Sequence, residues 1–198
     1  MERFVFARDR ESFLATRVLV RTTLSRYRPV APDAWRFEVN AYGRPEIAGR
    51  YSDLRFNLSN TRGLVVCAVT HDTDVGIDVE RLSRAAPLDV ADRFFAPVEV
   101  AALRALEPGE QGRRFFDYWT LKESYIKARG LGLALPLAGF AFHFDDARVP
   151  AIEIDPALGD HGSSWHFEQR LATADHLVSL CVRLRTPATP LRVRWQWA

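Results

Sequence analysis

One segment constrains the fold more than any other. Residues 113 to 129 predict a long helix that is apolar and aromatic around most of its circumference and that stops at Gly130. Trp119, Glu123 and Lys127 follow at four-residue intervals and share one face. A helix this apolar is largely enclosed, so Glu123 and Lys127 are charges near a core that need a partner charge or a metal. The alternative is an ordinary Glu and Lys pair on a solvated face.

The order of elements along the chain predicts an α+β fold. In the first half, a helix over residues 13 to 27 precedes strands over 35–39, 64–69 and 75–80. The second half begins near Pro87, with helices over 88–95, from Pro97, and over 113–129 after a break at Pro108 and Gly109. Strands are then expected over 140–144, 152–154, 165–171 and 177–184. We therefore expect two α+β halves, residues 1–86 and 87–198.

Composition excludes several classes of protein. The chain has 198 residues, 47% of them hydrophobic, which is enough to bury a core without disulfides or a structural metal. A net charge of +2 with scattered arginines argues against a nucleic-acid partner. There is neither a membrane-spanning apolar stretch nor the pattern of a signal peptide, so we expect no membrane contact and a cytoplasmic protein. Cys67 and Cys181 lie in apolar runs and are expected to be buried thiols.

An acidic pair lies on the strand predicted over residues 75–80. Side chains alternate along a strand, so Asp78 and Glu80 share one face, about 6.5 Å apart, while Ile77 and Val79 enter the core. Two carboxylates on one rigid strand can share Mg²⁺, which prefers carboxylate and phosphate oxygens. The alternative is an acidic face that is simply exposed to solvent.

Two further features indicate phosphate chemistry. Of 27 lysine and arginine residues only Lys122 and Lys127 are lysines, both in the long helix, and a compact ammonium suits a phosphate oxygen. Chance clustering of a rare residue is the alternative. Residues 56–63 form a predicted polar loop whose hydroxyls, amides and Arg62 could hold a phosphate, although a simple turn would have the same composition.

These motifs, in this order, resemble the Sfp-type 4'-phosphopantetheinyl transferases. The matching segments are Gly43-Arg44-Pro45, Phe56-Asn57-Leu58-Ser59, Gly76-Ile77-Asp78-Val79-Glu80, Arg93-Phe94-Phe95, Trp119 through Lys127, and Gly130 through Leu137. The last two segments are highly specific together, whereas the acidic strand motif alone is not. The resemblance spans nearly the whole chain and implies a pseudo-dimer of two related α+β halves with coenzyme A and magnesium in the cleft between them.

The resemblance also implies roles for individual residues. Asp78, Glu80 and Glu123 would bind Mg²⁺, which would bridge to the pyrophosphate of coenzyme A. Lys127 would contact that pyrophosphate and stabilise the charge that develops on it. Lys122 is assigned either to phosphate steering or to contact with the carrier protein.

A second group would contact the nucleotide end of coenzyme A. Ser59, Asn60 and Arg44 would approach its 3'-phosphate and adenosine. Asn60 stands where the family usually has histidine, and it can donate a hydrogen bond but carries no charge. Family members also usually begin with a further basic segment, so the resemblance implies a shorter start here. These departures imply weaker binding of coenzyme A unless other arginines compensate. Arg8, Arg10, Arg17 and Arg21 could supply some of the missing charge.

The reaction implied is attack by a serine hydroxyl of an acyl or peptidyl carrier protein on the β-phosphorus of coenzyme A, which releases adenosine 3',5'-bisphosphate. Glu123 is the candidate base, directly or through a metal-bound water. Such carriers serve fatty acid, polyketide or nonribosomal peptide synthesis, and no motif here chooses among them. A complete site within one chain implies a monomer. The alternative function is a protein of the same fold that binds coenzyme A or a nucleotide with little transfer activity.

Overall fold

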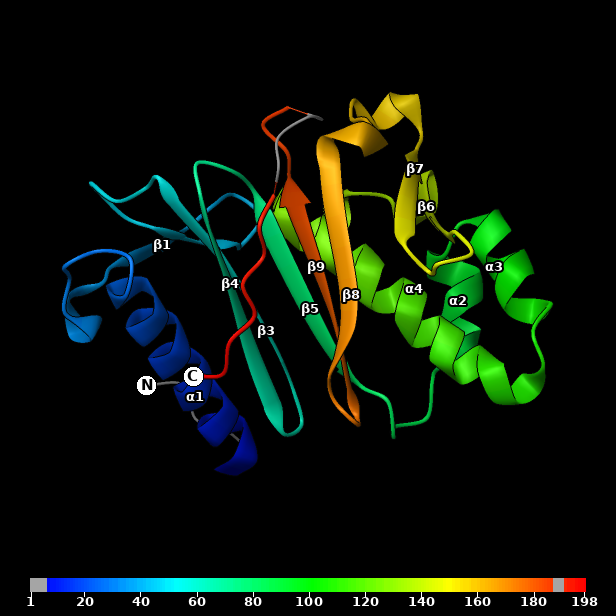
Figure 1. Ribbon diagram of the computed structural model, residues 1–198, viewed down its shortest axis with the longest axis horizontal. Coiled ribbons are helices and arrows are strands. Elements are labelled where there is room, and N and C mark those ends of the chain that lie inside the picture. The colour runs from blue at the N-terminus through cyan, green and yellow to red at the C-terminus, as the bar shows by residue number, and fades with distance from the viewer. Residues whose placement is uncertain (1–6, 187–190) are drawn as a thin grey trace.

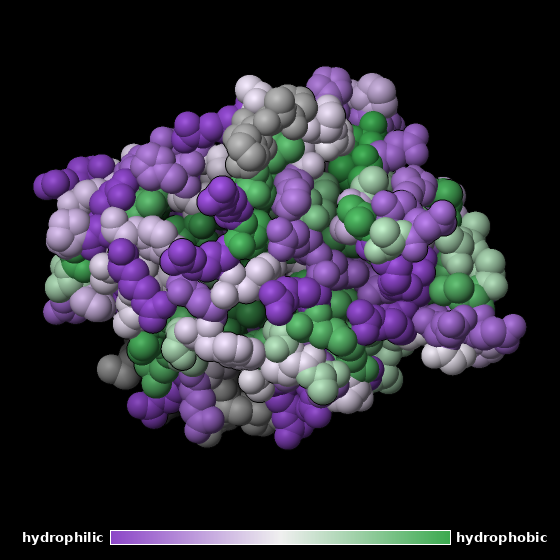
Figure 2. Space-filling view, in the orientation of Figure 1, coloured by the Kyte–Doolittle hydropathy of each residue, from purple (hydrophilic) through white to green (hydrophobic). Residues whose placement is uncertain are grey.

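The computed structural model describes residues 7–186 and 191–198 (Figure 1). Within these residues the chain folds into α-helices and antiparallel β-sheets, which confirms the predicted α+β class. No helix in the described ranges is both long enough and apolar enough to span a membrane. Figure 2 shows hydrophobic and hydrophilic side chains interspersed over the face seen in Figure 1.

The N-terminal part consists of a helix and two hairpins, at the left of Figure 1. Its elements are α1 (Ala7–Ser25), β1 (Phe37–Val39), β2 (Pro45–Ile47), β3 (Leu54–Thr61) and β4 (Leu64–His71). β1 pairs with β2 and β3 with β4, both antiparallel. Val20 and Leu24 of α1 are buried against Trp35, Leu54 and Phe56. This apolar contact holds the helix on the hairpins.

The prediction that the polar segment over residues 56–63 is a phosphate-binding loop is wrong, because the segment makes up most of strand β3. Its ladder with β4 runs from Leu54 opposite His71 to Thr61 opposite Leu64, and Gly63 takes a positive φ of 91° in the tight connection. The segment looked like a loop because one face of β3 is polar but still buried. Asn57 and Ser59 on that face are only 6% and 8% exposed.

The C-terminal part is built on a three-stranded sheet. β5 (Val75–Arg81), β9 (His176–Arg183) and β8 (Trp165–Thr173) lie side by side in that order, all antiparallel. Three helices and one hairpin complete it: α2 (Leu88–Phe94), α3 (Pro97–Arg104), α4 (Pro108–Arg129), β6 (Phe140–Phe144) and β7 (Pro150–Ile154). These elements agree with the predictions except at the start of α4. Pro108 begins that helix rather than breaking it, since proline fits a first helical turn.

Helix α4 is largely enclosed by the rest of the protein, as its composition predicted. It lies against the β5–β9–β8 sheet (Figure 1). Its residues Phe115, Leu121 and Tyr125 are fully buried in the largest apolar cluster. Gly130 ends the helix in the left-handed conformation, with φ 64°. Of the charged residues of α4, Lys122 is buried and Glu123 and Lys127 are partly buried, whereas Glu110 and Arg113 near its start are exposed.

The relation between the two halves stays a prediction. A division at residues 86 and 87 assigns β5 to the first half, whereas β5 pairs with β9 of the second half. The sheet pairing favours a division before Val75. Strand β5 thus lies where the two parts of the chain meet, with the β3–β4 hairpin on one side and β9 on the other.

Candidate functional site

The candidate site lies where α4 crosses β5, and a glycine permits that crossing. A Cβ atom at Gly76 would lie 1.9 Å from the Ser124 carbonyl oxygen and 2.5 Å from the Ala128 amide nitrogen. Both are backbone atoms of α4, so they cannot move aside singly. Gly76 therefore lets the helix approach the strand directly, and the residues alternating with it, Asp78 and Glu80, face the same side.

Lys127 connects α4, β5 and β3. Its Nζ lies 2.6 Å from Oδ1 of Asp78 and 3.0 Å from Oγ of Ser59, and it also reaches the Ile77 carbonyl at 3.4 Å. Ser59 Oγ donates to the same Asp78 Oδ1 at 2.9 Å. The predicted residues Ser59, Asp78 and Lys127 are thus brought together by three elements that are far apart in the sequence.

The second oxygen of Asp78 is different from the first. Asp78 is 5% exposed, and its Oδ2 is buried without a hydrogen-bond partner among the described residues. A buried carboxylate oxygen without a donor or a cation is unfavourable by an amount comparable to a lost charged hydrogen bond. Such an atom indicates a position where a cation or an ordered water belongs.

Glu123 faces this site from α4 and carries a perturbed carboxyl group. Burial raises its pKa to about 6, the negative charges of Asp78 and Glu80 act in the same direction, and Lys127 opposes them. Within residues 7–186 and 191–198, Glu123 takes part in no hydrogen bond or ion pair, so its oxygens have no competing donor there. A carboxyl with a pKa near neutrality is suited to proton transfer.

The carboxylates of Asp78, Glu80 and Glu123 are not arranged as a metal-binding site in this structure. In the described part of the chain, no group of three or more His, Cys, Asp or Glu side chains is arranged to hold a metal ion. Cationic side chains take that place: Lys127 holds Asp78, and Arg84 binds both oxygens of Glu80 at 2.9 and 3.2 Å. The set still suits Mg²⁺ chemically, because it offers only carboxylate oxygens and one of these is buried and unpartnered.

Comparison with known proteins decides the family. The family model described as the 4'-phosphopantetheinyl transferase superfamily matches residues 74–181, which is more than half of the chain. The chain belongs to this superfamily. A second model, described as the N-terminal part of a 4'-phosphopantetheinyl transferase, matches residues 1–72. The two models meet just before β5, where the sheet pairing also favours a division.

Individual relatives agree with this assignment. The chain is 39% identical over 135 residues to the 4'-phosphopantetheinyl transferase HetI of Nostoc, covering 67% of this chain and 57% of that protein. It is 36% identical over 152 residues to a 4'-phosphopantetheinyl transferase of Bacillus subtilis, covering 77% and 66%. The chain thus spans less than two thirds of the length of these relatives. A holo-(acyl-carrier-protein) synthase structure from Bacillus anthracis is similar with a TM-score of 0.45 and 18% identity, covering 56% of this chain and 94% of that one.

The residues predicted to contact the nucleotide are less clearly grouped. Arg44 lies at the end of α4, where it donates to the Ala128 carbonyl at 2.8 Å and pairs with Glu46 at 2.7 Å. A cation there is favoured by the negative end of the helix dipole. Asn60 points to the opposite side of β3 from Ser59 and donates to Ser12 Oγ of α1 at 3.0 Å. Contact of either residue with coenzyme A remains a prediction.

The predicted role of Lys122 does not agree with the structure. The side chain is 0% exposed, and its Nζ donates to Glu99 at 2.8 Å and to the Leu137 and Phe140 carbonyls at 2.7 Å each. All three protons of the ammonium are used, so none remains for a phosphate or a carrier protein. Although Lys122 is adjacent to Glu123 in sequence, it points to the other side of α4, into the core.

Two residues near the site, Asn57 and Glu99, had no role predicted for them from the sequence. Asn57 is buried on β3 and bonds to the backbone of β5. Glu99 is 1% exposed at the start of α3, where it accepts from Lys122 and from the Ala96 and Phe142 amides. The available signal for Glu99 was its place in a first helical turn, which is typical of an exposed capping residue. Nothing in the pattern showed that a lysine would be buried beside it.

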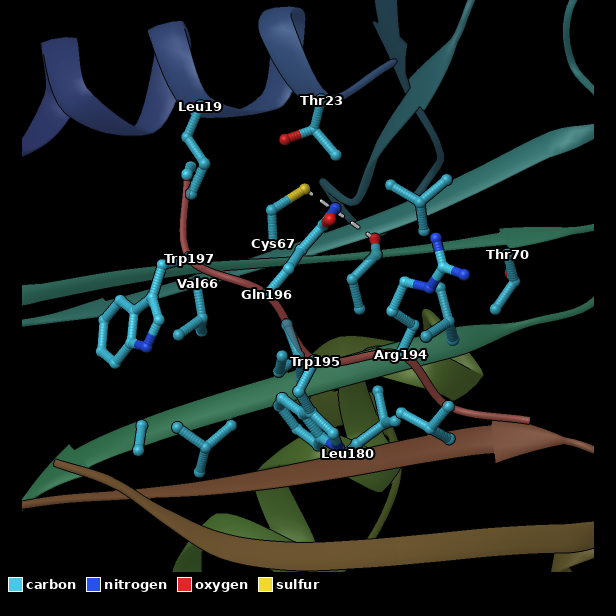
Figure 3. A pocket seen from close by; sticks show the side chains of 18 of the residues that line it. Leu19, Thr23, Val66, Cys67, Thr70, Leu180, Arg194, Trp195, Gln196 and Trp197 are labelled. Atoms are coloured by element: carbon cyan, nitrogen blue, oxygen red, sulfur yellow. Dashed lines mark hydrogen bonds between the residues drawn. The ribbon is translucent and has the colours of Figure 1, made fainter. Parts of the chain in front are cut away.

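A cavity lies on the other face of β5. A space of about 540 Å³ lies between α1, β4, the β5–β9–β8 sheet and residues 191–198 (Figure 3). Val193 and Trp195 pack there on the sheet, and Trp195 Nε1 donates to Glu168 at 2.9 Å. Ile77 lines this cavity, while Asp78 faces away from it toward α4. The strand therefore separates the cavity from the carboxylates.

Proposed function

We propose that this protein transfers the 4'-phosphopantetheine group of coenzyme A to a serine of an acyl or peptidyl carrier protein, in a Mg²⁺-dependent reaction that releases adenosine 3',5'-bisphosphate. The observation that carries the proposal is the buried, unpartnered oxygen of Asp78 beside Lys127 and Glu123. It occurs in a chain of the superfamily whose relatives are named as these transferases.

The metal-binding residues of this proposal are Asp78, Glu80 and Glu123. Mg²⁺ bound there would neutralise charge on the phosphate oxygens of coenzyme A. The acidic set contains no softer ligand, which favours a hard cation over zinc or copper. For Glu80 to take part, its carboxylate must exchange its two hydrogen bonds with Arg84, whose side chain is 40% exposed.

The remaining chemistry is assigned to side chains of the chain itself. The serine oxygen attacks the β-phosphorus, the bond from that phosphorus to the bridging oxygen breaks, and the nucleotide leaves with the bond electrons. Lys127 Nζ supplies positive charge beside the reacting phosphate. Glu123 is the proposed acceptor of the serine proton when its carboxylate is not bound to the cation, because the pKa of about 6 belongs to the metal-free site.

The site draws its acidic residues and Lys127 from one chain, so we propose that a monomer is competent. Arg44, Ser59 and Asn60 remain candidates for contact with the nucleotide. For Ser59 the hydroxyl already serves Asp78 and Lys127, so a phosphate contact would have to compete with these bonds.

The test is intact-mass spectrometry of an apo carrier protein incubated with this protein, coenzyme A and Mg²⁺, with EDTA as the control. A mass gain of one phosphopantetheine that EDTA abolishes supports the proposal. An Asp78→Asn variant should lose the transfer, whereas Asp145→Asn, a carboxylate on the β6–β7 connection, should not. Retention of coenzyme A without transfer to any of several carriers would favour a binding protein instead.

A further inference from the structure

Strand β5 carries the acidic pair, and one edge of it has no backbone partner in its sheet. The sheet order is β5–β9–β8, so β5 is hydrogen-bonded to β9 on one side only. On the other side the amides of Ile77 and Val79 point toward β3. Because Ile77 and Val79 are 3% and 2% exposed, these N–H groups need acceptors from the protein.

Side chains of β3 supply the acceptors. Oδ1 of Asn57 accepts the Ile77 amide at 2.9 Å, and Oγ of Ser59 accepts the Val79 amide at 3.3 Å. The backbone of β3 is paired with β4, and among the described residues no backbone ladder joins β3 to β5. Asn57 and Ser59 are two residues apart and therefore share one face of β3. The lengths of these two side chains thus set the spacing between β3 and β5.

The two amides belong to the residues directly before and after Asp78. Fixing both fixes the backbone from which the Asp78 carboxylate projects. Ser59 also donates to Oδ1 of Asp78, so the carboxylate is turned with Oδ1 toward Ser59 and Lys127. Its other oxygen, Oδ2, is the buried atom for which the described residues provide no partner. The hydrogen bonds from Asn57 and Ser59 to β5 and the position of the unpartnered Oδ2 therefore belong to one arrangement of β3 and β5.

We propose that Asn57 is a positioning residue, which with Ser59 forms an edge clamp on β5 that presents Asp78 Oδ2 to the cation of the site. The inference rests on the proposed function for its use of a cation. Asn57 acts through the backbone of β5 and does not touch the reacting atoms. Groups that orient a metal ligand from behind commonly alter metal affinity tenfold or more when removed, without being ligands themselves.

The test compares two substitutions at Asn57. Asn57→Leu has similar size and lacks the acceptor, whereas Asn57→Asp keeps an acceptor oxygen. Leu54→Val is the matched control, because Leu54 is buried on the same strand but packs toward α1. Two properties of the free protein are measured: the hydrogen-exchange protection of the Ile77 amide, and the affinity for Mn²⁺ as a probe for Mg²⁺, by titration calorimetry.

We expect Asn57→Leu to lower the protection of the Ile77 amide and to weaken Mn²⁺ binding, each at least tenfold. Asn57→Asp should keep both properties, and Leu54→Val should lower global stability while leaving Mn²⁺ affinity unchanged. Wild-type Mn²⁺ affinity in a folded Asn57→Leu variant would overturn the inference, as would equal losses in Leu54→Val. If Asn57→Leu does not fold, Asn57→Ala is measured in the same way against the same control.

The experiment separates this inference from the proposed function. A wild-type protein that binds Mn²⁺ and coenzyme A but modifies no carrier would refute the transferase proposal and leave the edge clamp standing. A folded Asn57→Leu protein with full Mn²⁺ affinity would refute the edge clamp whatever the wild-type protein transfers.

Discussion

The buried pair of Glu99 and Lys122 makes the sharpest prediction about stability. Lys122→Met removes the ammonium but preserves most of the side-chain volume. Both side chains of the pair are 0% exposed, and Lys122 Nζ lies 2.8 Å from the Glu99 carboxylate. Three acceptor atoms surround Nζ and match the three N–H donors of an ammonium, as in an ion pair, although burial lowers the pKa of Lys122.

The magnitude follows from what the substitution leaves behind. Glu99 would remain a carboxylate in the core, and the Leu137 and Phe140 carbonyls would lose their donor. Breaking a buried ion pair in this way costs about 3–5 kcal/mol, a large share of the about 5–15 kcal/mol that stabilises a typical domain. For a chain of this length we expect a fall in Tm of roughly 10 °C.

Glu99→Gln in the same background should restore part of this loss. Glutamine removes the buried charge, and its carbonyl oxygen can still accept one of the two amides that Glu99 holds, those of Ala96 and Phe142. We expect the double variant to be more stable than Lys122→Met by about 1 kcal/mol or more, measured by urea unfolding at pH 7.

The pH dependence of the Lys122→Met variant gives an independent check. Burial raises the pKa of Glu99, and Lys122 opposes this in the wild type. Without Lys122 the carboxyl takes up a proton more readily in the folded state, so the variant's stability is retained at low pH and lost as pH rises through the raised pKa. The deficit should therefore be smaller at pH 5 than at pH 8. A cost below about 1 kcal/mol at both pH values would refute the ion-pair interpretation.

Two other substitutions test the scaffold of the site. Gly76→Ala places a methyl group 1.9 Å from the Ser124 carbonyl, so α4 must move off β5; we expect a loss of about 3 kcal/mol or more in urea unfolding, and a fully stable variant would contradict this packing. Asp160 is opposed by burial, but hydrogen bonds from Tyr125, the His161 amide and Trp165 and the charge of Arg129 together lower its pKa. Its contribution is therefore present above the ordinary value and lost as pH falls through the lowered one. The difference in stability between the wild type and Asp160→Asn should be full at pH 7 and shrink below about pH 4. A difference that does not depend on pH would show that the charge of Asp160 does not stabilise the fold.

Local pattern predicted most elements of the fold because helix and strand periods, prolines and glycines agree in this chain. Gly130 ends α4 as predicted, and β6 spans the predicted residues 140–144. The β3 strand was missed since its polar residues face a buried partner instead of solvent. A single sequence does not show whether a polar face meets water or another strand.

The site residues also divide into those whose position follows from local spacing and those whose position depends on tertiary packing. Spacing alone placed Asp78 on one face of a strand, and Glu123 and Lys127 on one face of a helix. That these faces belong to one site was implied by the resemblance to the family. Lys122 and Glu99 could not be placed, since their pairing depends on how α4 packs against α3. Asn57 was visible only as a polar residue, and its function as an acceptor for β5 depends on the tertiary distance between two hairpins.

The charge balance of the site leads to a last prediction, which concerns how Mg²⁺ binding and coenzyme A binding affect each other. Three carboxylates, Asp78, Glu80 and Glu123, face the two cationic side chains Lys127 and Arg84. The excess negative charge repels an anionic substrate and, after burial, is the main reason that the pKa of Glu123 rises to about 6. A divalent cation reverses the sign of this excess.

Binding of Mg²⁺ and coenzyme A should therefore be cooperative. By linkage, Mg²⁺ must raise the affinity for coenzyme A by the same factor by which coenzyme A raises that for Mg²⁺, and we expect a factor of at least about ten. Titration calorimetry in each order measures both factors. Glu80→Gln removes one negative charge and should weaken the coupling, because coenzyme A then binds better without the metal. If coenzyme A binds with equal affinity in Mg²⁺ and in EDTA, the carboxylates do not act through the charge on the substrate, and their role in the site would have to be structural.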